Sequence, residues 1–310
     1  MLPYLFRRVV LAILLVVLVS SAALMLVEAA PGDHFSGFDL DPATASAERH
    51  RLGLDRPLLE RYGAWLGRAI RLDLGESLKY RRPVGALVAE RARRTALLGV
   101  AALVLATVIG LPAGILTGSR RNVWVVVARA LSLLFVSVPP LVTSFGVLLL
   151  ASRTGWFPVG GFPSDQASAF VVLQYLALPA IALALPIAAT LERLQSQALE
   201  EALGDPSVRA ARARGCSQAR IVWRHALRLS LKPVLAVYGV IVGSVLGGSF
   251  AVEIVTSWPG LGALMYEGLV ARDLYLVAGC AAAGAMFLAI GILLSDIGLA
   301  LVDPRVEDAA

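Results

Sequence analysis

Positive charge is concentrated in one stretch of the chain, residues 208–233, which holds six arginines, one lysine and no acidic residue. Guanidinium and ammonium groups donate hydrogen bonds to carboxylates, phosphates and carbonyls, so such a stretch suits an anionic or acceptor-rich partner. The whole chain is 58% hydrophobic and only 16% charged, whereas a soluble domain carries roughly a quarter charged residues. The stretch therefore interrupts a scaffold apolar enough to be embedded in a membrane.

Other patterns that support chemistry are missing from the sequence. Its three histidines, His34, His50 and His225, are far apart, and neither Cys216 nor Cys280 has metal-ligand spacing around it. It contains no GxxxxGK[ST] phosphate-binding loop and no HExxH motif, and no Ser/Lys or paired-Asp site lies at depth in an apolar segment. We therefore predict that the chain has no catalytic residue, metal or cofactor and does not bind ATP itself.

The basic stretch is predicted to form two short helices joined by a glycine turn. Asp205 is suited to cap a helix that has Pro206 at its first position, and Gly215 is suited to follow its C-terminus. Ser217 can then cap a second helix, residues 218–231. Four basic residues on this second helix lie four apart and form one stripe: Arg220, Arg224, Arg228 and Lys232.

Three interpretations of this helix–turn–helix remain open. It is a solvated loop that only follows the charge bias of membrane proteins, or a patch for anionic lipid, or a docking element for a cytoplasmic partner. In the third case its small residues, Ala210, Ala211 and Ala213, would let the partner approach closely. The candidate docking residues are Arg209, Ala210, Ala211, Arg212, Ala213, Gly215, Cys216 and Ser217.

Long windows without charge predict six transmembrane helices, because each is close to the ~20 residues needed to cross a bilayer and lipid leaves no partner for an unpaired backbone. The first window could also be a signal peptide, but it is longer than the usual apolar region of one, which favours a retained span. We predict spans at residues 9–30, 95–118, 123–152, 168–191, 233–255 and 274–301, with a transmembrane domain over 95–302. An external subdomain would occupy 31–94 and a cytoplasmic loop 192–232.

The positive-inside rule orients the chain. With residues 1–8 and 303–310 in the cytoplasm, the pair Arg120 and Arg121 and the basic stretch also face the cytoplasm. The net charge of +6 follows from these loops, so it does not indicate a nucleic-acid partner.

Some residues within the spans are candidates for a translocation pathway or a gate. Pro139 and Pro140 must disrupt the third span, because proline cannot donate a backbone hydrogen bond. The disruption is either a packing kink or a hinge in the pathway. Gly239, Gly243 and Gly247 lie four apart in the fifth span and indicate close helix packing, either beside the pathway or between two subunits.

Charged residues at the predicted span ends have two interpretations. Glu253, at the outer end, and Asp296, at the inner end, would cap or pair helices; alternatively, Glu253 lies at the outer mouth of the pathway and meets a substrate amine. Arg129 is predicted to snorkel to the inner face. Glu192 is predicted to mark the inner end of the fourth span.

Several motifs, in order, resemble the dipeptide/oligopeptide/nickel permeases of ATP-binding-cassette importers. Residues 208–215, 224–228 and 231–233 resemble the cytoplasmic "EAA" loop of that family in its VR-T-ARAKG form. Pro206, Arg209 and Lys232 depart from its broader pattern. Further matching segments are 31–33, 52–57, 72–77, 82–84, 258–262, 271–273 and 301–305, so the resemblance covers nearly the whole chain.

The resemblance implies an all-α polytopic membrane protein with the type I importer permease fold, placed in the bacterial cytoplasmic membrane. It implies a second homologous permease subunit, two ATPase subunits that bind ATP and Mg²⁺, and an extracytoplasmic solute-binding protein. The cargo would be a dipeptide or oligopeptide, with nickel chelates, glutathione and heme-like molecules as alternatives. The basic stretch would dock on the ATPases.

Two other classes of function remain as alternatives. A stand-alone secondary transporter would need ion-coupling charges in the middle of its spans, where this sequence has almost none. A structural membrane protein would use the basic stretch only to hold anionic lipid.

Overall fold

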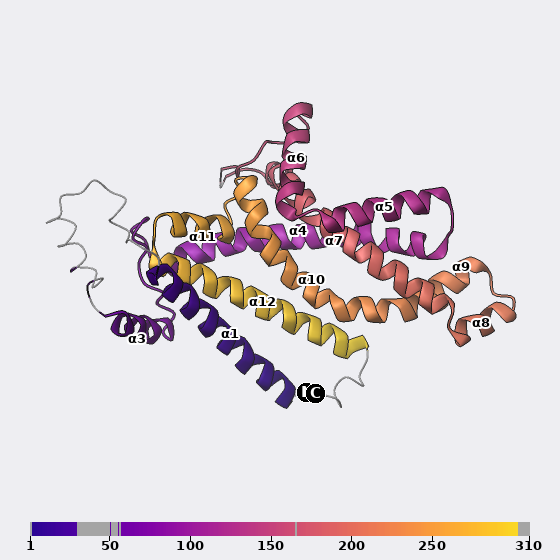
Figure 1. Ribbon diagram of the computed structural model, residues 1–310, viewed down its shortest axis with the longest axis horizontal. Helices are drawn as coiled ribbons and strands as arrows, with labels where there is room; N and C mark the ends of the chain where they lie inside the picture. Colours follow the sequence, from indigo (N-terminus) through magenta and orange to yellow (C-terminus); the bar gives the residue numbers. More distant parts are fainter. Residues whose placement is uncertain (1, 30–49, 51–54, 56, 165, 303–310) are drawn as a thin grey trace. The chain divides into compact units, whose positions relative to one another are not determined.

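The computed structural model describes residues 2–29, 50, 55, 57–164 and 166–302, and this part of the chain is built almost entirely of helices (Figure 1). Five of these helices are long and apolar enough to cross a membrane, and a bent pair brings the number to six if it is counted as one span. The predicted all-α polytopic fold class is confirmed. The helices are α1 (Leu2–Ala29), α3 (Leu58–Ala69), α4 (Val84–Ser119), α5 (Val123–Ser137), α6 (Pro140–Thr154), α7 (Ala169–Leu203), α8 (Pro206–Ala213), α9 (Gln218–Arg220), α10 (Leu227–Val255), α11 (Leu261–Val270) and α12 (Leu274–Val302).

The chain divides into two compact units, which are described separately. The first contains the described residues of 96–258 and 290–302, and the second those of 2–95 and 259–289. In the first unit, α4, α7 and α10 share one apolar core, which includes Leu98, Leu183, Leu191 and Ile241. The backbone N–H and C=O groups are paired within each helix. The helices can therefore lie in lipid and pack through their apolar side chains without leaving backbone groups unpaired.

A row of glycines brings α4 against α7. A Cβ added at Gly114 would lie 2.6 Å from the Glu192 carbonyl oxygen and 2.6 Å from Gln195 Cβ. At Gly110 and Gly118, the nearest α7 carbonyl oxygen would lie 2.5 and 2.7 Å from the added atom. Only glycine allows backbones to approach this closely, and the spacing of four residues keeps the row on one helix face.

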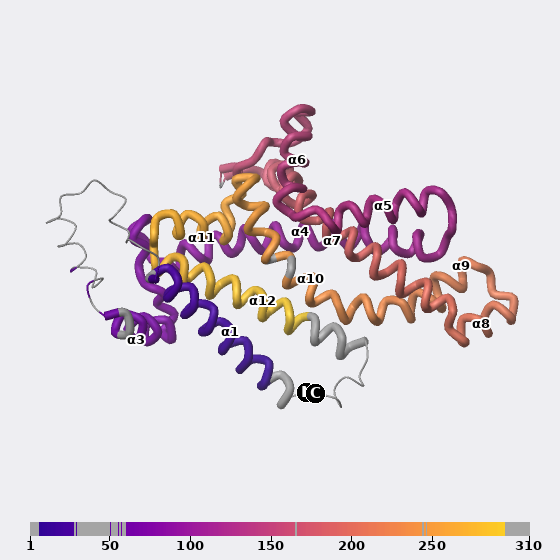
Figure 2. The backbone as a smooth tube through the Cα atoms, viewed as in Figure 1, coloured from indigo at the N-terminus to yellow at the C-terminus, as the bar shows by residue number. Residues whose placement is uncertain are grey.

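Two adjacent prolines break the third apolar segment. Val138 and Pro139 have extended backbone, with ψ angles of 122° and 148°, and Pro140 begins α6. As a result α5 and α6 are bent by 112°, and Figure 2 shows the tube turning sharply between them. The predicted disruption by the two prolines is confirmed, and the segment 123–152 consists of two helices joined at a sharp bend.

Several helices are longer than the predicted spans. Helix α4 begins at Val84, inside the predicted external subdomain, and α7 continues to Leu203, well into the predicted cytoplasmic loop. Helical backbone also runs without a break from Gln218 through a π-helical turn, Ile221–Ala226, into α10. Hydropathy detects only the apolar stretch of a helix. The charged residues beyond that stretch pair with side chains on neighbouring turns or helices, so the helix continues past the apolar stretch. Arg94 and Glu90 form such a pair at 3.2 Å.

In the second unit, Asp273 joins three segments that are distant in the sequence. Its buried carboxylate accepts hydrogen bonds from Ser77 Oγ at 2.6 Å, Lys79 N at 3.0 Å and Leu276 N at 3.2 Å. It thereby ties the loop before α4 to the start of α12, beside a core formed by α4, α11 and α12. The motifs at 72–77 and 271–273 therefore form one structural joint. The motifs at 31–33 and 303–305, and most of 52–57, lie outside the described residues.

Candidate functional site

The basic stretch forms the predicted helix–turn–helix, which we call the elbow (residues 205–217). The Asp205 side chain accepts hydrogen bonds from Ser207 N at 2.7 Å and Ser207 Oγ at 2.5 Å, and so caps α8. These bonds, first that from the hydroxyl, lower the pKa of Asp205 below its ordinary value of 3.8. Gly215 has a φ angle of +79°, the left-handed conformation that ends a helix and that glycine adopts without strain. The sequence prediction of both helix ends is confirmed.

The elbow is seated on α7 by its own apolar side. Val208 and Ala211 are fully buried, and Val208 belongs to a cluster with Leu199 of α7, Ile115 of α4 and Ile221. The burial of Ala211 differs from the expectation that it faces a partner. Residues 208 and 211 are three apart and share one helix face, so that face is used inside this chain.

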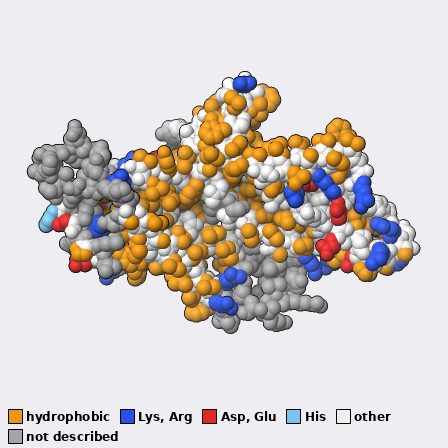
Figure 3. Space-filling view, in the orientation of Figure 1, with side chains coloured by type: hydrophobic (Ala, Val, Ile, Leu, Met, Phe, Trp, Pro, Cys, Tyr) orange, Lys and Arg blue, Asp and Glu red, His pale blue; other side chains and the backbone are white. Residues whose placement is uncertain are grey.

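The outer side of α8 is cationic with small residues between the charges. Arg209, Ala210, Arg212 and Ala213 are exposed, as are Gly215 and Ser217, while Cys216 is half-buried against the cluster beneath. In Figure 1 this elbow lies beyond the end of α7 and leads back into α10, and Figure 3 shows Lys and Arg side chains gathered there. The exposed arginines have short alanine side chains beside them, so a partner could reach the helix backbone.

The second helix of the basic stretch has the predicted two faces. Its four basic residues are all exposed, while Val222 and Ala226 are buried and Leu229 is half-buried. Trp223 lies at the border with 62% of its surface exposed. The helix does not end near residue 231 as predicted but continues through Pro233 to Val255, so the basic stripe is rigidly connected to an apolar span.

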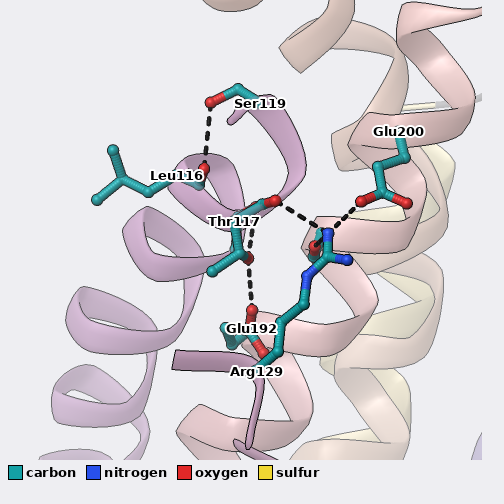
Figure 4. Close-up of polar contacts among 8 residues, drawn as sticks. Leu116, Thr117, Ser119, Arg129, Glu192 and Glu200 are labelled. Atoms are coloured by element: carbon teal, nitrogen blue, oxygen red, sulfur yellow. Dashed lines mark hydrogen bonds and ion pairs between the residues drawn. The ribbon is translucent and has the colours of Figure 1, made fainter. Parts of the chain in front are cut away.

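A polar cluster lies where α4, α5 and α7 meet, shown in Figure 4. Arg129 Nη2 donates hydrogen bonds to the Thr117 carbonyl oxygen at 2.9 Å and Ser196 Oγ at 3.2 Å, and it pairs with the Glu200 carboxylate. Thr117 Oγ1 donates to Glu192 Oε1, and the Glu192 side chain is only 2% exposed. Arg129 therefore ties three helices together, contacts that the prediction of a snorkelling residue did not include.

The candidate pathway residues have different surroundings. Pro140 lines a hollow of about 190 Å³ with Leu183, Thr190 and Gly248, formed by α6, α7 and α10. Gly247 is exposed with no atom within 4 Å of an added Cβ, so it makes no close helix contact within the described chain. Glu253 is completely buried and does not face solvent in this conformation.

The comparisons with known proteins agree with this arrangement. The family model "Binding-protein-dependent transport system inner membrane component" matches residues 110–308, and the model of the N-terminal part of such membrane components matches residues 1–92. The chain belongs to this family. It is a multi-pass protein of the inner membrane, and the resemblance stated from its motifs is confirmed.

Relatives of this permease match it from end to end. A putative peptide permease protein of Brucella suis biovar 1 is 34% identical over 318 residues, with 99% of both chains covered. The oligopeptide transport system permease protein AppB of Bacillus subtilis is 31% identical, covering 99% of this chain and all of its own. The dipeptide transport system permease protein DppB of Lactococcus lactis subsp. cremoris is likewise 31% identical, over 99% and 100%.

Sequence reasoning found the elbow of this permease but missed the cluster behind it. Glu192 was predicted to mark the inner end of the fourth span, and the sequence did not show that it lies within α7 and contacts α4. One signal was available, because Glu192, Ser196 and Glu200 recur every four residues, like the α4 glycines. Which residue of another helix meets such a stripe depends on tertiary packing.

Proposed function

We propose that this chain is a translocating permease subunit of an ATP-driven importer for dipeptides or oligopeptides. The elbow carries this proposal: its inner face is buried on α7 and its outer face presents cations and small side chains, as a lever for a cytoplasmic ATPase requires. The names of the relatives support the peptide cargo. ATP and Mg²⁺ are bound by two partner ATPases, not by this chain.

The other partners follow from the same family. A second, homologous permease subunit completes the pathway, and an extracytoplasmic solute-binding protein delivers the cargo. Exchange between ATP-bound and ATP-free ATPases moves α8, and with it α7, which biases the helix bundle between inward-open and outward-open states. The hollow beside Pro140 is the candidate surface along which the cargo passes.

Gly215 offers a direct test of the docking role. Gly215→Leu places a side chain in a left-handed conformation at a cost of about 1–2 kcal/mol, with no clash because no atom lies within 4 Å of an added Cβ. We expect this variant to lose the ATPases on co-purification, or to hydrolyse ATP without peptide uptake, while still inserting into the membrane. Gly215→Asn is the matched control, because asparagine tolerates this conformation better. Wild-type uptake by the leucine variant would contradict the docking role.

An anionic-lipid patch is the second candidate for the basic stretch, favoured by exposed Trp223 beside the arginine stripe. The two roles separate by face: Arg224→Gln with Arg228→Gln should weaken binding to vesicles with phosphatidylglycerol, whereas Arg209→Gln with Arg212→Gln should weaken ATPase docking. If the first pair alone released the ATPases, the docking face would lie on the second helix.

Both termini and the elbow are proposed to lie in the cytoplasm. A single cysteine at Arg121 should react with a membrane-impermeant maleimide only after the cells are opened, whereas one at Trp156, an exposed residue, should react in spheroplasts. These measurements need the native Cys216 replaced by Ser. The opposite labelling pattern would overturn the orientation.

A further inference from the structure

Hydrogen bonding around Arg129 is unevenly distributed. Within the described chain, all three of its hydrogen bonds leave from Nη2, although this nitrogen carries only two hydrogens. Nearby, Glu192 Oε2 is buried and has no hydrogen-bond partner among the residues that the structure describes. An uncompensated buried carboxylate is costly. One side of Arg129 thus has a surplus of acceptors while an acid in the same cluster lacks a donor.

The two acids are arranged as alternative partners for one cation. Glu192, Ser196 and Glu200 lie four apart and share one face of α7, with the two acids about 12 Å apart along the helix axis. Arg129 contacts Ser196, the middle member of the row. In Figure 4 its side chain passes Glu192 before its guanidinium reaches Glu200. All four residues line a single hollow of about 230 Å³, which gives the guanidinium room to move.

The neighbouring Arg193 also lines this hollow. Consecutive residues on a helix point in directions about 100° apart and do not face each other. Within the described chain no ion pair joins Arg193 to Glu192. Thr117 supplies one hydrogen bond to the other oxygen, Oε1, so Oε2 still lacks a donor.

We propose that Arg129 exchanges its ion-pair partner between Glu200 and Glu192, and that this exchange is a two-position latch between α5 and α7. The state described here has Arg129 paired with Glu200, the acid nearer the elbow. Helix α5 can follow the exchange because it ends at the extended Val138–Pro139 backbone, and α7 senses the elbow because Val208 is buried against its Leu199 side. Pairing with Glu192 draws α5 toward the hollow beside Pro140. The inference rests on the proposed importer function.

The test uses the assembled complex in lipid nanodiscs. Val126 on α5 and Glu201 on α7, both exposed, are each replaced by cysteine, and a spin label is attached to each cysteine. Cys216 and Cys280 are replaced by Ser and Ala. The distance between the labels is measured without nucleotide and with ATP plus vanadate. Wild type should give two populations whose ratio depends on nucleotide.

The two acid variants should shift this ratio in opposite directions. Glu200→Gln should favour the Glu192-paired population by about 1.5- to 5-fold, the range for a partly exposed ion pair, and Glu192→Gln should favour the Glu200-paired one. A merely structural role would give shifts of the same sign, or loss of assembly in both. In an Arg129→Gln background, neither acid variant should have a further effect.

Shifts of equal sign, or additive effects in the Arg129→Gln background, would overturn the latch. Co-purification of the ATPases with the same samples separates this outcome from failure of the proposed function. If the ATPases assemble and hydrolyse ATP while neither Glu200→Gln nor Glu192→Gln changes the ratio of the two distance populations, only the latch is wrong. If no ATPase associates with wild type, the importer assignment itself fails.

Discussion

The contact between α4 and α7 at Gly114 allows a quantitative test of how this permease is assembled. A Cβ at this position would lie 2.6 Å from a carbonyl oxygen of α7, so α7 would have to retreat by about 0.8 Å to restore ordinary contact. Overpacking of this kind costs about 1–3 kcal/mol. We expect Gly114→Ala to be destabilised by this amount relative to a control that gains the same helix propensity.

Gly146→Ala in α6 is that control. It also replaces a helical glycine by alanine, a gain of up to about 1 kcal/mol, but within the described part of the chain no atom lies within 4 Å of its added Cβ. The free energy of unfolding of both purified variants is measured by SDS titration in mixed micelles. Gly99→Ala should fall between them, because its nearest neighbour, at 3.3 Å, is a Val245 methyl that can rotate.

The result that would refute this reasoning is equal stability of Gly114→Ala and Gly146→Ala. It would mean that the α4 and α7 backbones do not meet at the glycine row. The Thr117–Glu192 hydrogen bond and the Arg129 cluster depend on the same approach, so they would have to be reconsidered too.

Three further predictions concern the elbow and the second unit. Val208→Ala should destabilise the seat of the elbow by about 1–2 kcal/mol through lost apolar burial, detected as more ATP hydrolysis per peptide imported. Folding lowers the pKa of Asp205, so the cap is fully present above the unfolded pKa near 3.8 and is lost only as the pH falls through the lower folded value. The amides of α8 should therefore show the same protection from hydrogen exchange, corrected for intrinsic rates, from pH 5 to 8. Asp205→Ala should abolish this protection. Asp273→Ala leaves the buried Ser77 hydroxyl and the Lys79 amide without their acceptor, which should cost about 1–3 kcal/mol, measured by SDS titration against Asp273→Asn, which keeps an acceptor.

The local structure of the elbow was predictable because it is encoded within a few residues. Asp205, Pro206 and Gly215 each fix one end of α8 through a short-range effect: a cap, a preset φ angle, a left-handed turn. The break at Pro139 and Pro140 followed from the same kind of reasoning. The family was also predictable, because the motifs occur along this chain in the same order as in the permeases that it resembles.

Helix ends and buried polar contacts were less predictable. The span ends at residues 95 and 191 followed apolar length, but the helices extend beyond them. For Arg129 and Glu192 the sequence showed the charge but not the partner, so their contacts with Thr117 and Glu200 came only from the structure. In the fifth span, the four-residue spacing of Gly239, Gly243 and Gly247 suggested close packing; among the described residues no atom lies within 4 Å of a Cβ added at Gly247, whereas the glycine row on α4 contacts α7.

The sequence by itself determined that this chain is a helical membrane protein with a cationic elbow, because apolar length, capping residues and turn glycines act over a few positions along the chain; its ordered motifs added the resemblance to permeases. Only the tertiary structure decided which face of the elbow is free, that Ala211 is turned inward, and that Arg129 meets Thr117 and Glu200. Those outcomes depend on how helices pack against one another, and a sequence does not show which residues of separate helices meet.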